Sequence, residues 1–440
     1  MRCLVVDSDA IGLDLVLRAS AAGHEVRWFR QARYPIRDGE GMKGFQVIDD
    51  WQVSMPWAKD GLIIATHNGR YVHDFDRYRE LGYKIFAPTV KSAELEINRS
   101  AGMKAMQAVG IDIPPYETFN SLEDAEKFAR KSDRAWVFKP MGDEQKKALT
   151  YVSHDPADLV GWLRRQIKSG TQLKGQCMLQ EKVDMLAEIG VSGWCGPDGF
   201  LPDKYQSCYE HKKLMNDELG PNTGEMGTLT QYCEEDKLFD EMLKPMEPVL
   251  MALGHRGDFA IGAMIDTKGK AYPLEFTARL GWPCFFIQMA SHRGDPIKWM
   301  RDLLDGKDTL RVSYDPAIGV VMTQPPFPNN VGPVESVVGN PIEGIEEIGD
   351  QAHLVSVMKG RGPKMVDGQV REGDVFLTTD SYVMCVTGLG KTIEKARDKV
   401  YGGVDKVRFA DRQYRTDIGC KVADKLAALH KHGYALDLRA

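Results

Sequence analysis

Short apolar runs alternate with amphipathic stretches over the first 90 residues. A stretch with helical spacing follows the first apolar run and ends at Gly23. Strands are predicted at residues 2–7, 24–29, 60–66 and 83–88, because each is a compact apolar run. Strand–helix–strand alternation of this kind predicts a parallel, doubly wound sheet.

The remainder of the chain carries a mixed pattern. A helix is predicted from residue 91 to about 118, where the proline pair in GIDIPPY marks a boundary. Two apolar stretches at 259–266 and 271–280, joined by the turn TKGK, predict a β-hairpin. Further strands are predicted at 135–140, 177–183 and 187–196, and in AIGVVMT, HLVSVM and SYVMCVTGLG. The segment KTIEKARDKVYGGV near the end predicts a helix.

Composition narrows the class of protein. The chain has 440 residues, 43% of them hydrophobic, which suits two to four globular domains. A net charge of −6 gives no broad basic field for nucleic acid, and no apolar run reaches the roughly 20 residues that span a membrane. The eight cysteines include no CxxC pair, so we expect reduced, mostly buried thiols rather than a zinc site. The chain begins directly with a strand pattern, so we expect a cytoplasmic protein without a signal peptide.

The strand in PLEFTARLGW carries polar side chains in register. Glu275, Thr277 and Arg279 are spaced by two and therefore point to one face. Leu274, Phe276 and Ala278 point to the other face, which is expected to be the core side. The carboxylate and the hydroxyl can ligate Mg²⁺, and the guanidinium can bind an anion through two hydrogen bonds. An exposed sheet face with a diagonal Glu–Arg pair is the other interpretation. The strand pattern alone leaves the two equally open.

Two other strand ends carry charged residues. Lys139 ends an apolar strand before a loop that contains Lys146 and Lys147, and a mobile ammonium at such a place suits phosphate binding. A solvated lysine at the end of a strand is the alternative. Glu181 interrupts the apolar strand in LQEKV, where its carboxylate could accept a hydrogen bond from the amine of a bound ring. Taken alone, the position of Glu181 favours a salt bridge or an edge strand.

The segment ELGPNTGEMG, at 218–227, crowds turn-forming residues between more regular stretches. Glycines let backbone N–H groups approach an anion closely, and successive N–H groups form an anion-binding nest. The preceding segment EHKK, at 210–213, supplies cations. The two segments therefore form a candidate anion site, with a long surface turn as the alternative.

Taken together, these segments resemble the glycinamide ribonucleotide synthetase (phosphoribosylamine–glycine ligase) family of the ATP-grasp superfamily, over nearly the whole chain. The matching segments are KIFAPT, LEINR, VFKP, LQEKV, EHKK, GPNTGEMG, GAMIDTKGKAYPLEFTARLGWP, VMCVTGLG and YRTDIG. The order and spacing of GPNTGxMG and ExxxRxG are specific. The resemblance implies an α/β fold in three domains. These are an N-terminal Rossmann-like domain at 1–90, an ATP-grasp domain at 91–307 with a small lid at about 119–185, and a C-terminal α/β domain at 308–440.

The resemblance also implies a chemistry. Members of this family phosphorylate a carboxylate with ATP, and an amine then attacks the acyl phosphate to give an amide, ADP and phosphate. Arg279 and Lys212 are implied to be catalytic, while Glu275 and Thr277 are implied to hold Mg²⁺ or Mn²⁺. The implied ATP-binding residues are Arg99 (lysine in the family), Lys139, Lys147, Glu181, Val183 and Glu188. The implied substrate-binding residues are His211, Asn222, Thr223, Gly224 and Trp282. A loop at 141–150 is expected to close over the site.

The departures from the family pattern fall mainly in the half that binds the amine. Asp7 and Asp9 stand where the family has a glycine-rich loop with an Arg-Glu-His run, and two aspartates would repel a 5′-phosphate. After the metal strand, Trp282 and Cys284 replace two acids, and Thr277 replaces an asparagine. We therefore predict an ATP-dependent carboxylate–amine ligase that activates a small amino acid such as glycine. Its amine is predicted to differ from phosphoribosylamine and to be nucleotide-like.

Other functions remain open on the sequence alone. One is a true phosphoribosylamine–glycine ligase of de novo purine biosynthesis with a remodelled pocket. Another is a non-catalytic ATP-binding relative, although the retained Glu275 and Arg279 argue against it. A dinucleotide-dependent oxidoreductase lacks support, because the first turn has no GxGxxG. The expected partners are small molecules, an amino acid and an amine, with no membrane and no nucleic acid. The sequence leaves monomer and homodimer equally open.

Overall fold

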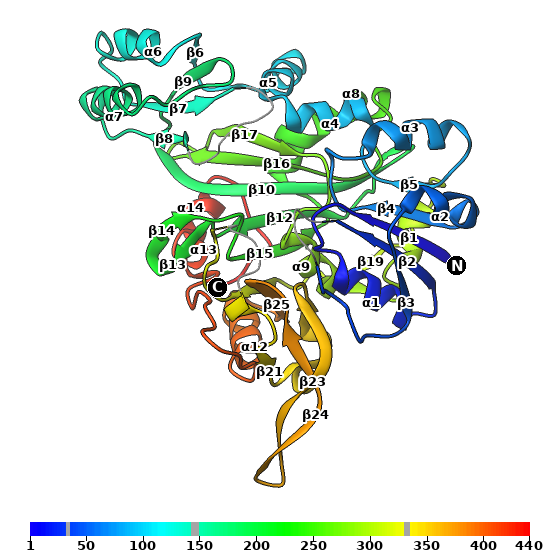
Figure 1. Cartoon of the computed structure of the whole chain (residues 1–440). Coiled ribbons are helices and arrows are strands. Elements are labelled where there is room, and N and C mark those ends of the chain that lie inside the picture. Colours follow the sequence, from blue (N-terminus) through cyan, green and yellow to red (C-terminus); the bar gives the residue numbers. More distant parts are fainter. Residues whose placement is uncertain (32–35, 142–148, 330–334) are drawn as a thin grey trace.

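The computed structural model describes the whole chain apart from residues 32–35, 142–148 and 330–334. Figure 1 shows a broad central sheet, an N-terminal sheet beside it, a small sheet above one end and a long hairpin that projects from the opposite end. The predicted α/β class is confirmed by this arrangement. Among the described residues, none of the helices combines the length and the apolar character of a membrane span.

The N-terminal sheet is parallel, with the strand order β3-β2-β1-β4-β5. Its strands are β1 (Arg2–Asp7), β2 (Glu25–Arg30), β3 (Phe45–Ile48), β4 (Leu62–Ala65) and β5 (Ile85–Phe86), and its helices are α1 (Leu13–Ala21), α2 (Trp51–Ala58) and α3 (Val72–Glu80). Parallel strands bring their carboxyl ends to one edge of a sheet. At that edge the Thr66 hydroxyl donates to Asp7 Oδ1 over 2.8 Å, so the ends of β1 and β4 are fixed to each other.

The helix predicted from residue 91 to about 118 is divided in two, α4 (Val90–Ile97) and α5 (Arg99–Ala108). The prediction was wrong beyond Ala108, because the chain there leads into a strand that begins at Tyr116. Asn98 separates them with an extended backbone, and its side chain accepts a hydrogen bond from the Ala101 N–H over 3.1 Å. Asparagine at this position satisfies an N–H group at the start of a helix. Arg99 therefore becomes the first residue of α5.

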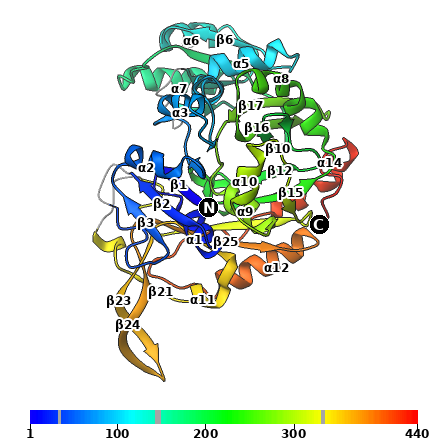
Figure 2. The same ribbon diagram turned by 90° about the vertical axis from the view of Figure 1, so that its right-hand side faces the viewer.

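A small antiparallel sheet with the order β6-β9-β7-β8 follows. Its elements are β6 (Tyr116–Phe119), α6 (Leu122–Ala129), β7 (Trp136–Pro140), β8 (Tyr151–Val152), α7 (Pro156–Lys168) and β9 (Cys177–Glu181). Phe138, Leu159 and Leu179 belong to a hydrophobic cluster separate from the main core. Figure 2 shows this unit above the rest of the molecule. The unit therefore has a core of its own, and its role as a lid stays a prediction.

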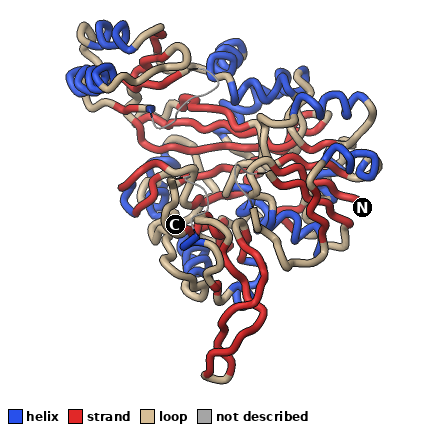
Figure 3. Tube along the Cα trace, viewed as in Figure 1, coloured by secondary structure: helices blue, strands red, loops and turns tan. Residues whose placement is uncertain are grey.

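The large sheet has the order β17-β16-β10-β12-β15-β20-β25-β22, with β11 attached to β10. Its strands are β10 (Met185–Gly196), β11 (Gly199–Phe200), β12 (Tyr205–Glu210), β15 (Gly227–Cys233), β16 (Gly257–Asp266), β17 (Ala271–Thr277), β20 (Ala317–Thr323), β22 (Ala352–Leu354) and β25 (Tyr382–Leu389). Hydrogen bonds between β15 and β20 carry this sheet across residue 308, the predicted start of the last domain. The sheet is the longest strand array in Figure 3.

Helices α9 (Cys284–Ser291) and α12 (Ile393–Val404) cover opposite faces of the large sheet. Gly319 on β20 faces Ile287 of α9, and Gly388 on β25 faces Val400 of α12. The register pairs Gly319 with Thr387, the neighbour of Gly388, so the two glycines point to opposite faces. Helix α9 therefore covers the face of the sheet that carries Gly319.

The remaining elements lie around these sheets. They are β13 (Lys213–Met215), β14 (Leu219–Asn222), α8 (Glu247–Ala252), β18 (His292–Arg293), α10 (Lys298–Leu303), β19 (Arg311–Val312), β21 (Pro341–Ile342), α11 (Ile345–Ile348), β23 (Val357–Val366), β24 (Gln369–Thr378), α13 (Cys420–Ala423) and α14 (Leu426–Lys431). The projecting hairpin is β23–β24, and its base is tied to the N-terminal domain by the hydrogen bond from Lys359 N to Glu40 O, 2.8 Å. All cysteines are free thiols, with Cys284 and Cys420 half-buried and the others buried.

Candidate active site

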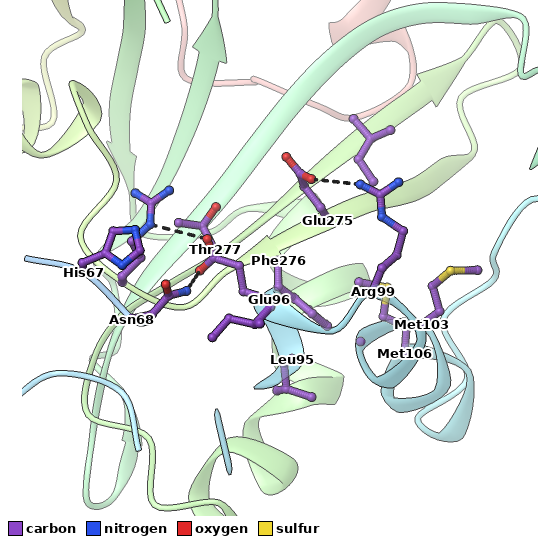
Figure 4. A pocket seen from close by; sticks show the side chains of 14 residues that line it. His67, Asn68, Leu95, Glu96, Arg99, Met103, Met106, Glu275, Phe276 and Thr277 are labelled. Carbon is purple, nitrogen blue, oxygen red and sulfur yellow. Dashed lines mark hydrogen bonds and ion pairs between the residues drawn. The ribbon is translucent and has the colours of Figure 1, made fainter. Parts of the chain in front are cut away.

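A cavity of about 350 Å³ lies between β17, helices α4 and α5, and the segment after β4 (Figure 4). The residues lining it are His67, Asn68, Leu95, Glu96, Ile97, Arg99, Gly102, Met103, Met106, Leu274, Glu275, Phe276, Thr277 and Arg279. The cavity therefore brings together four of the residues singled out in the sequence: Arg99, Glu275, Thr277 and Arg279.

A β-bulge in β17 helps to build one wall of this cavity. The register pairs Gly262 with Glu275 but Ala263 with Pro273, which leaves Leu274 as the extra residue. Phe276 is buried while Glu275 and Thr277 are half-buried, as alternation along a strand requires. Leu274, expected on the core side, instead lines the cavity beside Glu275, because the bulge resets the alternation.

Arg99 and Glu275 form an ion pair across the cavity, with 3.6 Å between Nη2 and Oε2. Figure 4 shows the guanidinium reaching from α5 towards the carboxylate on β17. Burial lowers the pKa of Arg99, and the Glu275 charge opposes that shift. The carboxylate of Glu275 and the hydroxyl of Thr277 form an oxygen donor set of the kind that suits a hard cation, which completes its shell with water and phosphate oxygens.

Arg279 is held by a second acid, Glu96, with 3.4 Å between Nε and Oε1. Glu96 Oε2 accepts two hydrogen bonds of 2.6 Å, from the side-chain amide of Asn68 and from the backbone N–H of Ala278. Figure 4 shows Asn68 and Glu96 pointing towards each other. Sequence reasoning missed both residues, although Glu96 lies within the matched segment LEINR.

Lys139 lies at the end of β7 and is buried, with its ammonium donating to Gln180 Oε1 over 2.7 Å. Burial, together with the nearby Arg99, lowers the pKa of Lys139 to about 8, against the opposing charges of Glu275 and Glu188. These charges influence one another, so Lys139 belongs with the cavity although it does not line it. Lys147 lies outside the described residues, as does most of the loop at 141–150.

Two of the predicted ATP-binding residues, Glu181 and Val183, lie at the junction of β9 and β10. Glu181 ends β9 and forms an ion pair with Arg134, 2.9 Å between Nη1 and Oε2. Val183 is half-buried in the short segment before β10. Both roles remain predictions, and the ion pair is the alternative that the sequence left open for Glu181.

Lys212 is the centre of a second charged group beside the cavity. Its ammonium contacts Glu188 Oε1 at 2.6 Å and Glu210 Oε2 at 3.1 Å. Burial disfavours its charge, but Glu210 and Glu188 raise the pKa of Lys212 well above its ordinary value, with a further contribution from Glu275. Lys212 therefore stays protonated at the edge of the site, and Glu188 is its direct partner.

The neighbouring His211 is buried and differs from Lys212 in its protonation. Its Nε2 lies 3.4 Å from the backbone N–H of Gly419, and burial lowers the pKa of His211 to about 3. The imidazole is therefore neutral at pH 7. The low pKa and the contact to the C-terminal segment are typical of a structural histidine, and its predicted role in substrate binding remains a prediction.

The segment GPNTG forms part of a small hairpin rather than a loop. Asn222 ends β14 and pairs with Lys213 of β13. Thr223 donates from its hydroxyl and its backbone N–H to the Lys212 carbonyl, at 2.9 and 2.8 Å. Gly224 and Asn222 are exposed. The hairpin thus fixes the backbone of Lys212, which positions its ammonium beside Glu188.

Trp282 lies apart from the residues that line the cavity. Its indole N–H donates to the Thr66 carbonyl over 3.3 Å, and its ring packs against Phe285 and Phe286 with centroids 5.3 and 4.8 Å away. These contacts join the end of β4 to the start of α9. They account for the tryptophan through packing, and its contact with a substrate remains a prediction.

Comparisons with known proteins agree with one another. Residues 99–284 match the family model "Phosphoribosylglycinamide synthetase, ATP-grasp (A) domain", and residues 317–421 match "Phosphoribosylglycinamide synthetase, C domain". The chain is 26% identical to a phosphoribosylamine–glycine ligase of Neisseria meningitidis serogroup B, over 80% of this chain and 81% of that protein. It is 25% identical to the ligase of the same name from Halalkalibacterium halodurans, over 92% of this chain and 96% of that protein.

Solved structures show the same fold. The phosphoribosylamine–glycine ligase of Thermotoga maritima superposes with a TM-score of 0.68 at 20% identity, covering 95% of this chain and all of that one. N5-carboxyaminoimidazole ribonucleotide synthetase of Thermotoga maritima superposes with a TM-score of 0.57 at 13% identity, over 93% of this chain and 99% of that one. The ATP-grasp fold predicted from the sequence is thereby confirmed.

Proposed function

Because this chain belongs to the phosphoribosylglycinamide synthetase family of ATP-grasp ligases, we propose that it joins glycine to phosphoribosylamine at the expense of ATP. The observation that carries the proposal is the cavity beside β17, where Arg99, Arg279, Glu275 and Thr277 converge within the region that matches the ATP-grasp model. The names of the relatives support phosphoribosylamine more than the different amine predicted from the sequence. We therefore prefer the alternative that the sequence analysis left open.

The chemistry follows from the needs of an amide bond. A free carboxylate is a poor acyl donor, and phosphorylation by ATP supplies a leaving group that the amine can displace. Two anions, ATP and the carboxylate, must first approach each other, and nearby cations offset their repulsion. Arg99 and Lys139 would contact the phosphates, and Arg279 would face the phosphoryl group that is transferred.

Glu275 and Thr277 would hold Mg²⁺ in this cavity, because their oxygens suit a hard cation and lie beside the phosphate-binding arginines. When bound, the ion neutralises phosphate charge and orients the phosphates. Glu96 holds Arg279 in place through its ion pair, while Asn68 and the Ala278 N–H hold Glu96. The protein thus fixes the guanidinium before the substrates meet.

The direct test is ADP release by the purified protein. We expect ADP to form only when glycine and phosphoribosylamine are both present, and the product mass to equal that of their amide. Glu275→Ala serves as the matched control for contaminating ATPases. Release of ADP with neither substrate, or faster release with another carboxylate than with glycine, would refute this assignment.

One observation favours a second candidate, the same ligase acting on another amine. Asp9 and His67 face each other at the carboxyl ends of β1 and β4, with 3.4 Å between Oδ2 and Nε2. Ligands of doubly wound sheets bind at this edge, and an acidic side chain there opposes a phosphate. A panel of amines without phosphate, scored by glycine-dependent ADP release, tests this candidate. Glycine-dependent ADP release with phosphoribosylamine, and with none of the other amines, would eliminate this second candidate.

A further inference from the structure

A strip of polar side chains lies buried beneath α9, and the proposed reaction assigns it no part. We define the polar strip as Ser192, Gln206, Cys208, Thr228, Thr230 and Gln288, with Glu225 at its end. The register pairs Ser192 with Gln206, Cys208 with Thr230 and Glu210 with Thr228, so these strand residues share one face of the large sheet. Gln288 comes from α9, which covers that face.

The polar atoms of the strip are only partly satisfied. At the end nearer to β10, Gln288 Nε2 donates to Gln206 Oε1 over 2.8 Å, while Gln206 Nε2 and Gln288 Oε1 have no hydrogen-bond partner among the described residues. Towards the other end, the same is true of Thr228 Oγ1, Thr230 Oγ1 and Glu225 Oε1. A buried polar atom without a partner is costly, so a run of such atoms needs an explanation.

Within the strip, Glu225 is the side chain that a cationic ligand would stabilise most. It directly follows Gly224 of the GPNTG segment and is 8% exposed. Burial raises the pKa of Glu225 well above its ordinary range, Glu210 and Cys208 add to that shift, and Lys212 and Lys421 oppose it. The backbone places the two residues on adjacent segments, because the N–H groups of Met226 and Thr223 donate to the carbonyls of His211 and Lys212, both over 2.8 Å. The ammonium of Lys212 itself is paired with Glu188 and Glu210.

We propose that Glu225 receives the ammonium group of the amino acid substrate, while Lys212 faces the carboxylate that is to be phosphorylated. The inference rests on the proposed function and names a residue that determines its specificity. An acid and a base side by side are complementary to a zwitterion, which carries both charges on one small molecule. An arriving ammonium supplies the positive partner that the buried carboxyl needs in order to ionise. Thr228 Oγ1 offers the same ammonium a neutral acceptor.

Two other occupants of the strip make different predictions. Ordered water would also satisfy the hydroxyls and the carboxyl, and would give them no part in substrate recognition. The ammonium form of the amine substrate has the same charge as that of the amino acid. An experiment must therefore separate the Michaelis constants of the two substrates.

The test is Glu225→Gln, which keeps the shape of the side chain and removes its charge. We expect the KM for glycine to rise on the order of tenfold to a hundredfold, because a hydrogen bond to a charged group is lost. We expect kcat and the KM values for ATP and the amine to stay within about threefold of the wild type. Glycolate has a hydroxyl in place of the ammonium, so the preference for glycine over glycolate should narrow by a similar factor. Glu225→Asp should restore part of the lost affinity.

Asp236→Asn is the matched control, because Asp236 is another buried acid whose carboxylate already accepts from the Ser207 hydroxyl and the Phe239 N–H. The KM for glycine should not change in this variant. If Glu225→Gln does not fold, Thr228→Val tests the same end of the strip and should raise the KM for glycine several-fold. An unchanged KM for glycine, whether or not the KM for the amine rises, would overturn the inference.

A binding measurement distinguishes failure of this inference from failure of the proposed function. If the wild type forms no ADP with glycine and phosphoribosylamine, the proposed function fails. In that case, thermal protection of the protein by glycine is the measurement that tests the inference. Glycine, but not glycolate, should raise the melting temperature of the wild type and leave that of Glu225→Gln unchanged. Equal shifts in both proteins, or no shift in the wild type, would overturn it.

Discussion

Two neighbouring regions of this molecule handle charge in opposite ways. In the cavity beside β17, each arginine faces a carboxylate, Arg99 with Glu275 and Arg279 with Glu96. In the polar strip beneath α9, Glu225 is buried without a hydrogen bond to Oε1. Ligands of the cavity must compete for cations that are already paired, which suits strongly charged phosphates. A ligand of the strip must bring its own positive charge. Under the proposed roles, the cavity would bind the nucleotide and the strip would recognise the amino acid.

The largest effect is expected from Glu275→Ala. The change removes the carboxylate that is proposed to hold Mg²⁺ and that pairs with Arg99. Neither the ion nor the guanidinium is then held in position to bind phosphate. We expect ADP release to fall by about a thousandfold or more, equivalent to about 4 kcal/mol. Glu346→Ala, which removes an exposed glutamate from α11, should leave the rate unchanged. A rate within about tenfold of the wild type, in a protein with an unchanged melting temperature, would contradict the metal role.

A smaller effect is expected from Glu96→Gln. The amide still accepts from the Ala278 N–H, but it no longer attracts the guanidinium of Arg279. We expect kcat to fall by about tenfold while the KM for ATP changes less, because Arg279 loses its position rather than its charge. Steady-state kinetics measure both constants. An unchanged kcat would show that the Glu96–Arg279 pair is structural only.

The pH dependence of kcat/KM for ATP tests the role of Lys139, a cation beside the cavity. Burial lowers the pKa of Lys139 to about 8, so the free enzyme holds this positive charge below pH 8 and loses it above. We expect kcat/KM for ATP, which reports the free enzyme, to fall by about tenfold between pH 7 and pH 9. Lys139→Arg keeps its charge across that range and should abolish the fall. The same decline in the arginine variant would assign the titration to another group.

The sequence predicted the sheets better than it predicted their irregularities. The apolar runs of β1, β4 and β20 were predicted because burial on both faces leaves a continuous hydrophobic signal. Strand β3 was missed, since only Phe45 and Ile48 are half-buried and the residues between them are exposed. The break at Asn98 between α4 and α5 was missed as well, because asparagine inside a helical pattern is not by itself a stop.

The residues of the candidate site likewise fall into those that the sequence predicted and those that it missed. Glu275, Thr277 and Arg279 were found because their spacing by two is visible in the predicted strand, although β17 ends at Thr277 and Arg279 lies just beyond it. Asn68 and Glu96 were not predicted, because the contacts from Asn68 to Glu96 and from Glu96 to Arg279 form only when three distant segments fold together. Glu225 stands in a segment rich in turn residues, where a glutamate is normally exposed, and only the packing of α9 on the sheet reveals its burial.

Trp282 lies between the two regions, and the smallest effect is expected there. Its indole N–H donates to the Thr66 carbonyl, and its ring packs on Phe285 and Phe286 at the start of α9. Trp282→Phe keeps an aromatic ring and removes the hydrogen bond, so the melting temperature should fall by about 2 °C while every KM stays within about twofold. Thermal melting and steady-state kinetics with glycine, ATP and the amine measure this. If instead the KM for the amine rises about tenfold with no change in melting temperature, Trp282 contacts that substrate, as the sequence predicted. The region that recognises substrates would then extend from the polar strip to the end of β4.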